Sequence, residues 1–348
     1  MMEQGLILGV DGEQFEIRKA DAVVERIRAA DVTEVLVFGN ITLTPACTAL
    51  LLSRGIDTVF LTARGRYRGR LVGPASKNVD LRVSQYARWH DPEFARAMAR
   101  SIVRGKVSNQ RNLILRAQRE LKHEALAKAA ADMRRLLVSL EKEDDVEAIR
   151  GFEGQAAAVY FGNFGSCIRN PAFSFTRRTR RPPLDPVNAM LSFGYTLLNV
   201  AMETIVNRVG LDPMLGTFHA PDYGRPSLSL DLIEEFRPVV VDSLVLRLVN
   251  RRQVAPEDFE EPPGDEDAWL DDAPEQAEAA EPRKRPVWLG ETGRRVFFRE
   301  WGRRLRESML YEPRHEVRTL EDIMRHQVYH CARVIKGEEE AYQAFVPR

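Results

Sequence analysis

The sequence predicts an α+β protein in which a small amino-terminal β-rich domain precedes a larger, all-helical domain. Two observations predict this division. Over about the first eighty residues, short alternating apolar segments are separated by glycines, which is typical of strands and turns. From about Asp80 onward the apolar residues recur at helical spacing instead. Because 348 residues exceed one ordinary compact domain, we expect domains at 1–78 and 79–348, joined by the hinge-like stretch GPASKN.

The amino-terminal domain is expected to contain several strands and one helix. Thr44 and Pro45 suit the cap and first turn of this helix, and Gly55 suits its end. The strands are predicted from apolar alternation between glycines. The predicted strand segments are LILGV, EQFEI, EVLVFG, DTVFLT and RYRGRLVG.

The second domain is expected to begin with a long helix. Asp91 and Pro92 suit its cap and first turn, while Phe94, Met98 and Ile102 fall on one apolar stripe. The same periodicity predicts further helices at 126–142, 153–164, 185–210 and 319–345.

Composition excludes several classes of protein. The hydrophobic fraction of 44% and the charged fraction of 29% are typical of a globular protein. No apolar run approaches the roughly 18 residues needed to span a bilayer, and the amino terminus soon turns acidic, unlike a secretory signal. We therefore expect a cytoplasmic protein with no membrane partner. Cys47, Cys167 and Cys331 are too widely spaced for a zinc site or a disulfide scaffold, so we expect them to be buried.

The formal net charge of zero conceals a strongly acidic segment. Residues 255–282 contain twelve Asp or Glu and no Lys or Arg, so the rest of the chain carries a formal charge of +12. Such a body is typical of proteins that bind a polyanion, although a solvated surface balanced by an acidic loop is an equal alternative. The acidic segment itself is predicted to be a disordered, dispensable insert.

Residues 219–238 place an imidazole beside several carboxylates. Ser227 is a plausible cap for a helix that Pro238 would end, and Asp231 and Glu234 share one face of it. His219, just ahead of the turn, could fold back over the helix start. This donor set suits Mg²⁺ or Mn²⁺ better than a metal that prefers thiolates. The competing interpretation is a solvated acidic helix beside a satisfied histidine.

A second candidate carboxylate lies in the segment GFEGQAAAVYF. Glu153 sits there at the predicted start of a helix rich in small residues. A carboxylate in such crowded apolar surroundings is costly unless it is paired or bound to a metal. Alternatively, Glu153 only complements the positive end of the helix.

A third candidate is a basic cluster that could bind nucleic acid. Arginine side chains contact phosphates in forked geometry, and Phe173 and Phe175 nearby could stack on unpaired bases. An ordinary solvated loop has the same composition. The cluster consists of Arg177, Arg178, Arg180 and Arg181.

These segments together resemble the family of CRISPR-associated protein one, the integrase of CRISPR adaptation. The resemblance rests on the GxEGxAAxxYF element around Glu153, RRPPxDPVNAxLSFGYTLL at 180–198, and LDPxLGxxH with GRPSLxLDLxEEFRP between Leu211 and Pro238. IVRGKVSNQR at 102–111 fits as well. Agreement at four ordered places is far more specific than any one element.

The resemblance implies a fold, a site and an activity. It implies a β-domain used for dimerisation and a helical catalytic domain with one Mg²⁺ or Mn²⁺ held by Glu153, His219 and Glu234. Asp231 matches a neighbouring acid that positions water or the surroundings of the metal. The implied reaction is transesterification, in which a protospacer 3′ hydroxyl attacks a CRISPR repeat, accompanied by metal-dependent DNA endonuclease activity.

The implied partners are protospacer and repeat DNA, a second copy of the chain in a homodimer, and CRISPR-associated protein two. Two other functions remain open. One is a catalytically inactive DNA-binding scaffold, against which the intact trio argues. The other is a metal-dependent phosphoesterase of small molecules, which needs no extended basic surface.

Overall fold

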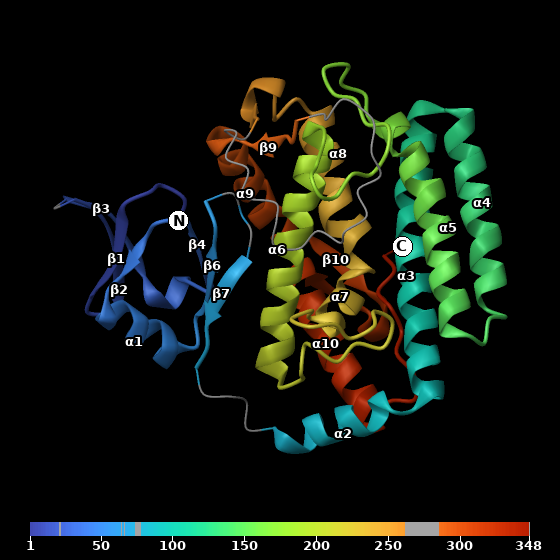
Figure 1. Ribbon diagram of the computed structural model, residues 1–348, viewed down its shortest axis with the longest axis horizontal. Helices are drawn as coiled ribbons and strands as arrows, with labels where there is room; N and C mark the ends of the chain where they lie inside the picture. Colours follow the sequence, from blue (N-terminus) through green and yellow to red (C-terminus); the bar gives the residue numbers. More distant parts are fainter. Residues whose placement is uncertain (21, 64, 66, 74–77, 262–284, 348) are drawn as a thin grey trace.

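The computed structural model has a strand-rich amino-terminal part at one end and a larger, mostly helical part at the other (Figure 1). The α+β class predicted from the sequence is therefore confirmed. The structure describes residues 1–20, 22–63, 65, 67–73, 78–261 and 285–347.

Two small sheets and one helix make up the amino-terminal part. The strand orders are β3-β2-β1-β5 and β4-β6-β7, with β1 antiparallel to β2 and β4 parallel to β6. The sequence prediction missed β3, which is exposed almost throughout and so lacks alternation, and β5, which has two residues. The strands are β1 (Leu6–Asp11), β2 (Gln14–Lys19), β3 (Ala22–Arg28), β4 (Glu34–Phe38), β5 (Thr42–Leu43), β6 (Asp57–Leu61) and β7 (Tyr67–Leu71).

Helix α1 (Pro45–Arg54) begins and ends where the sequence predicts. The Thr44 hydroxyl accepts a hydrogen bond from the Cys47 amide, and Gly55 ends the helix with a left-handed φ of 62°. Cys47 and Leu51 are fully buried in the smaller hydrophobic core. Local capping signals therefore determined this helix.

Helix α6 runs through the middle of the carboxy-terminal part, with α9 on one side of it and α8, followed by the bundle of α3, α4 and α5, on the other (Figure 1). Helix α10 also packs against α6. Asp91 caps α3 as predicted, since its side chain accepts from the amides of Glu93 and Phe94. The helices are α2 (Val79–Trp89), α3 (Pro92–Leu121), α4 (Glu124–Leu140), α5 (Val146–Phe164), α6 (Pro186–Val209), α7 (Ser227–Ile233), α8 (Ser243–Asn250), α9 (Glu291–Arg306) and α10 (Leu320–Lys336).

The central position of α6 explains its composition. Its 24 residues are long and apolar enough to cross a membrane by length and mean hydropathy, although they do not form one continuous apolar run. In the structure 67% of its most apolar stretch is buried inside the protein. The helix thus forms much of the main hydrophobic core.

The carboxy-terminal part is not all-helical, which corrects the prediction. Among the described residues, two short antiparallel ribbons lie between the helices. A few paired residues can connect neighbouring helices as well as a loop can. The ribbons are β8 (Phe259–Glu260) with β9 (Trp288–Leu289), and β10 (Ser308–Tyr311) with β11 (Glu316–Thr319).

The start of the acidic segment is ordered, which corrects its predicted bounds of 255–282. Asp258 accepts a hydrogen bond from the Ala255 amide, and its own carbonyl accepts one from Gly290. The Phe259 ring packs edge-on against Phe173, with centroids 6.0 Å apart. An aromatic side chain and local capping therefore anchor these residues despite their charge. The predicted disorder of 262–282 lies outside the described residues.

The two parts of the molecule share a hydrophobic contact. Phe38 on β4 packs against Phe193 of α6 and Phe298 of α9, with centroids 6.5 and 5.2 Å apart. Further along α6, Arg70 of β7 forms an ion pair with Glu203, at 3.4 Å. This contact places the second sheet against the core that supports the site.

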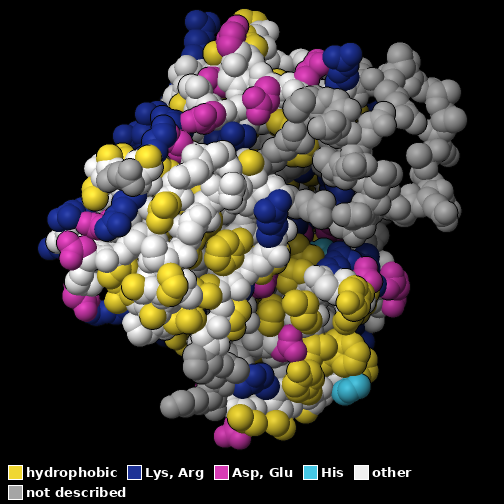
Figure 2. Space-filling view, turned by 60° about the vertical axis from the view of Figure 1, so that its left-hand side comes forward, with side chains coloured by type: hydrophobic (Ala, Val, Ile, Leu, Met, Phe, Trp, Pro, Cys, Tyr) yellow, Lys and Arg dark blue, Asp and Glu magenta, His cyan; other side chains and the backbone are white. Residues whose placement is uncertain are grey.

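Helix α2 exposes an apolar stripe at the lower end of the molecule. Val79, Val83 and Tyr86 lie on one face at helical spacing and are 60%, 61% and 47% exposed. Figure 2 shows hydrophobic side chains gathered in this lower region. The opposite face of α2 packs inward through Leu81 and Gln85, which are buried.

Candidate active site

The loop between α6 and α7 brings His219 back over helix α7, as predicted. Asp231 on α7 accepts hydrogen bonds from three successive backbone amides, those of Thr217, Phe218 and His219, at 2.7, 3.0 and 2.8 Å. A side chain on Gly216 would place its Cβ 2.8 Å from the Asp231 carboxylate. Glycine therefore lets the loop pass this close.

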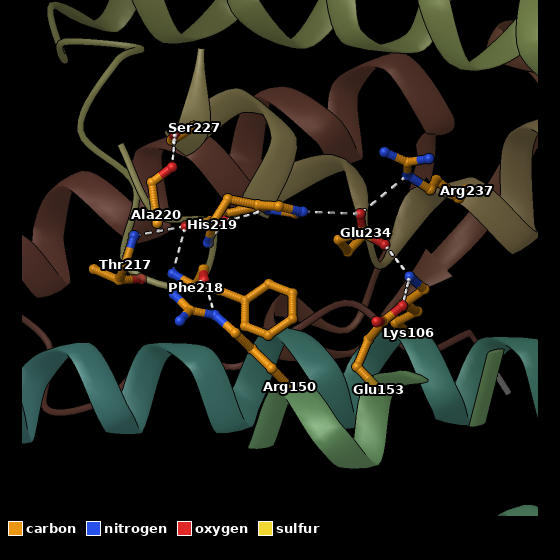
Figure 3. Close-up of polar contacts among 11 residues, drawn as sticks. Lys106, Arg150, Glu153, Thr217, Phe218, His219, Ala220, Ser227, Glu234 and Arg237 are labelled. Carbon is orange, nitrogen blue, oxygen red and sulfur yellow. Dashed lines mark hydrogen bonds and ion pairs between the residues drawn. The ribbon is translucent and has the colours of Figure 1, made fainter. Parts of the chain in front are cut away.

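Asp231 also orients the imidazole of His219. Nδ1 of His219 lies 2.8 Å from the same carboxylate oxygen that accepts from its amide. Because Asp231 is fully buried and ringed by donors, it stays an acceptor, and Nδ1 carries the proton. The Nε2 lone pair then faces Glu234, whose nearest oxygen is 3.9 Å away (Figure 3). This is the tautomer that a metal-binding histidine requires.

The chain around α7 departs from the sequence prediction at both ends. Ser227 does not cap the helix, since its hydroxyl donates to the Ala220 carbonyl at 3.2 Å. Pro238 does not end it either, because the chain continues as a π-helical stretch, Arg237–Asp242, into α8. A proline removes one amide donor and crowds the preceding turn, and here the backbone accommodates this by widening.

Glu234 is a buried, ionised carboxylate. It is 3% exposed, and Arg237 Nε lies 3.2 Å from one oxygen while Lys106 Nζ lies 2.5 Å from the other. Burial would raise the pKa of Glu234, but the charges of Arg237 and Lys106 outweigh it and lower the pKa to about 2. The solvated acidic helix considered from the sequence is therefore excluded for this residue.

Glu153 lies in the middle of α5, not at its start. The helix begins at Val146, because the Asp145 side chain accepts from the Ala148 amide. A role in complementing the positive helix end is therefore wrong, since that effect is confined to the first turn. The Glu153 carboxylate instead forms an ion pair with Lys106 (Figure 3).

Arg150 joins the helix of Glu153 to the loop of His219. It lies about one turn before Glu153, and its Nε and second terminal nitrogen donate to the Phe218 carbonyl at 2.9 and 2.6 Å. Figure 3 shows this contact between α5 and the loop. It therefore limits how far the two predicted ligands can move apart.

The predicted ligands converge around Lys106 and have the chemistry of a divalent-cation site. Among the described residues no group of three acidic, histidine or cysteine side chains is drawn together closely enough to hold an ion. However, the ammonium of Lys106 lies between the carboxylates of Glu153 and Glu234, with His219 beside them. Two carboxylates and one imidazole nitrogen around a cationic position fit Mg²⁺ or Mn²⁺.

Sequence reasoning missed three residues of this site, namely Lys106, Arg150 and Arg237. Lys106 left a signal, since it lies on α3 among the buried Ile102, Val103 and Val107. A lysine at an inward position needs a buried counter-charge. Predicting which residue supplies that counter-charge requires knowledge of how α3 packs against α5.

The Glu235 side chain binds the carboxy-terminal residues and not the three predicted ligands. Its carboxylate accepts from Gln327 and Tyr342 at 3.0 Å and from the Phe345 amide at 2.8 Å. Burial is the main reason that its pKa is raised to about 8. The predicted helix at 319–345 ends early at Gly337, with a left-handed φ of 76°, so that the following residues can reach Glu235.

The basic cluster divides into exposed and structural arginines. Arg178 is half-buried, and its guanidinium donates to Asn188 at 2.8 Å and to Ser192 at 3.0 Å. These α6 acceptors give Arg178 a structural role, and its DNA contact stays a prediction. Arg177, Arg180 and Arg181 are exposed, and their DNA contacts stay predictions as well.

The predicted stacking of Phe173 and Phe175 on unpaired bases is wrong. They are 6% and 8% exposed, because Phe173 packs on Phe259 and Phe175 on Phe161 and Phe164. Burying these apolar rings in the core is more favourable in free energy than exposing them on the surface.

A groove of about 380 Å³ lies along α5 beside the exposed arginines. Ala157 and Phe161 line it and follow Glu153 by one and about two helical turns, so they share its face of the helix. The groove therefore leads toward the candidate metal site. Its lining comprises Ala157, Ala158, Phe161, Gly162, Thr176, Arg177, Arg178 and Arg180.

Residues 1–281 match the family described as CRISPR associated protein Cas1. The chain belongs to the Cas1 family. A CRISPR-associated endonuclease Cas1 of Rhodospirillum rubrum is 42% identical over 271 residues, which are 74% of this chain and 77% of the relative. Another from Moorella thermoacetica is 34% identical over 357 residues, covering 100% of this chain and 97% of the relative. The resemblance stated from the sequence is confirmed.

Solved structures share the Cas1 fold. A CAS1 protein from Thermotoga maritima has a TM-score of 0.79 at 23% identity, covering 99% of this chain and 98% of that one. A casposase bound to integration product has a TM-score of 0.80 at 21% identity, with 98% and 90% covered. The Cas1 part of a Cas6-RT-Cas1–Cas2 complex has a TM-score of 0.76 at 23% identity, covering 99% of this chain and 35% of that one.

Proposed function

We propose that the chain is a CRISPR adaptation integrase, a metal-dependent DNA endonuclease and transesterase that inserts protospacer DNA into the CRISPR repeat array. The observation that carries this proposal is the convergence of Glu153, His219 and Glu234 in a Cas1 chain. Its relatives are named as endonucleases, and a structurally similar casposase was solved with an integration product.

In the proposed mechanism Glu153, Glu234 and Nε2 of His219 hold one Mg²⁺ or Mn²⁺. When bound, this ion polarises the phosphodiester and stabilises charge on its oxygens. Asp231 keeps the proton on Nδ1 of His219, which leaves Nε2 free to bind. Arg237 holds its positive charge beside Glu234 and over the Tyr195 ring, at 4.6 Å, where it attracts an incoming phosphate.

The reaction forms one phosphorus–oxygen bond and breaks another. A DNA 3′ hydroxyl attacks the repeat phosphodiester and gives its proton to water, while the 3′ oxygen of the cut strand leaves and takes up a proton from water to become a 3′ hydroxyl. With water as the nucleophile, the same groups hydrolyse the phosphodiester. The same stabilisation of charge on the reacting oxygens therefore supports both the joining and the cutting of DNA strands.

We propose the same partners that the sequence resemblance implies. These are DNA, a second copy of the chain and CRISPR-associated protein two, in the cytoplasm. The similar solved structures include a complex with Cas2 and a DNA-bound casposase, which supports the DNA and Cas2 partners.

The groove along α5 is the proposed path of DNA to the metal. Arg177, Arg180 and Arg181 provide charge for phosphates, while Ala157 and Gly162 leave space for a sugar-phosphate backbone. A Cβ added to Gly162 would meet nothing within 4 Å, which indicates open space at that wall.

An integration assay tests the proposed function. The purified chain, its small partner, a labelled duplex with free 3′ ends and a supercoiled repeat-bearing plasmid are expected to give label covalently joined to relaxed plasmid. Chelation of divalent ions is expected to abolish the product. DNA binding without turnover in Mg²⁺ or Mn²⁺ would indicate a scaffold, and turnover confined to small phosphate esters would indicate a phosphoesterase.

The exposed arginines are expected to contribute to DNA affinity by neutralising phosphates. Replacing Arg177, Arg180 and Arg181 by Ala should reduce the slope of log affinity against log salt by about 0.9 for each phosphate that is no longer neutralised. Equilibrium binding of a labelled duplex at several salt concentrations measures this. Arg178→Ala should lower thermal stability as well, because it removes the hydrogen bonds that Arg178 donates to Asn188 and Ser192 on α6.

A matched control removes the same charge elsewhere. Lys128, Arg134 and Arg135 are exposed on α4, the outer helix of its bundle (Figure 1). Replacing these three by Ala should leave the salt slope nearly unchanged. Equal slopes for the two triple variants would show that only net charge matters, and the proposed DNA path would then be wrong.

A further inference from the structure

Lys106 occupies an unusual position for a lysine. It lies near the middle of α3, is 7% exposed, and its neighbours Ile102, Val103 and Val107 are buried. Its ammonium contacts one oxygen of Glu153 and lies 2.5 Å from one oxygen of Glu234. Figure 3 shows the lysine reaching between these carboxylates. A buried cation thus joins two predicted metal ligands that come from different helices.

The arrangement follows from electrostatics. Two carboxylates close together repel each other, and Glu234 is almost wholly shielded from water. A cation between them offsets this repulsion. Lys106 supplies one positive charge there, while a divalent ion would supply two at the same oxygens.

The ammonium and the ion cannot both keep these contacts. A divalent ion such as Mg²⁺ binds carboxylate oxygens at about 2.0–2.1 Å, which would leave it close to the ammonium and strongly repelled. Lysine has a flexible four-carbon chain that allows the ammonium to withdraw. Glu153 is 21% exposed and lies at the more open side of the site, whereas Glu234 is enclosed.

We propose that Lys106 is a built-in competitor for the metal: its ammonium holds Glu153 and Glu234 together and must be displaced when the ion binds, so it sets the metal affinity of the site. This inference rests on the proposed function, because it takes these residues as metal ligands. Lys106 is a positioning residue, since it acts through the two carboxylates.

The test is the affinity for Mn²⁺ of Lys106→Met, measured by titration calorimetry on the full-length chain without DNA. Methionine keeps a similar unbranched shape but lacks the charge. We expect the affinity to rise by about tenfold or more, because the ion no longer displaces a cation. Lys106→Arg should restore weaker binding. Lys128→Met, on the exposed face of α4, should bind like the wild type.

Thermal unfolding is a second test of the proposal, which applies if Lys106→Met folds poorly without metal. Without metal, Lys106→Met should unfold at a lower temperature than the wild type, because Glu153 then loses its cation and Glu234 keeps only Arg237. Saturating Mn²⁺ should raise its unfolding temperature more than it raises that of the wild type.

The outcomes distinguish this inference from the proposed function. Unchanged or weaker Mn²⁺ binding by Lys106→Met, together with lost binding by Glu234→Ala, would overturn the role of Lys106 while the metal site stands. Mn²⁺ binding that survives in both Glu153→Ala and Glu234→Ala would overturn the metal site itself, and the inference with it.

Discussion

Glu153→Ala, His219→Ala and Glu234→Ala are each expected to reduce metal-dependent DNA cleavage and joining by about a thousandfold or more. Each substitution removes one donor from the site that holds the ion, and with it the stabilisation of charge on the reacting oxygens. Single-turnover nicking and joining rates in Mg²⁺ and in Mn²⁺ measure the effect. Circular dichroism checks that each variant is folded.

Matched controls separate this loss from a general effect of changing charge. Glu147 lies on the same helix as Glu153, but its side chain is 73% exposed and pairs with Arg150. His315 is 86% exposed and lies far from the predicted ligands in sequence. Glu147→Ala and His315→Ala should keep rates within a few-fold of the wild type. Near wild-type nicking by His219→Ala and Glu234→Ala would contradict the assignment of the ligands.

Asp231→Ala is expected to impair both activity and folding, unlike the loss of a metal ligand alone. The structure adds a stability cost, because Asp231 is fully buried and accepts from three backbone amides and one imidazole. Leaving such donors unpaired costs about 3–5 kcal/mol of unfolding free energy. Denaturant unfolding measures this cost.

The conservative variant Asp231→Asn separates the two contributions of Asp231. Asparagine keeps the shape and one acceptor oxygen, so part of the stability should return. Its amide group cannot replace the carboxylate oxygen that fixes the His219 tautomer. Activity should therefore stay low while stability recovers in part, and nitrogen NMR of the imidazole reports the tautomer. Wild-type stability in Asp231→Ala would show that the loop does not depend on this carboxylate.

The sequence by itself determined those features that depend on near neighbours. Thr44 and Gly55 determined the bounds of α1, and Asp91 determined the start of α3, because caps act within one turn. The spacing of Asp231 and Glu234 placed them on one face of a helix for the same reason. The ordered motifs also identified the Cas1 family, and with it the three predicted ligands.

Pairing between distant segments was decided only by the tertiary structure. Lys106 precedes Glu153 by 47 residues, and nothing local indicates that packing of α3 against α5 would join them. Arg177 and Arg178 are adjacent in sequence, yet only Arg178 turns toward α6 and becomes a structural residue. Phe259 likewise orders the start of an acidic segment through a ring contact 86 residues away. The physical reason is that caps and periodicity depend on short-range geometry, whereas burial and charge pairing depend on which faces the whole fold brings together.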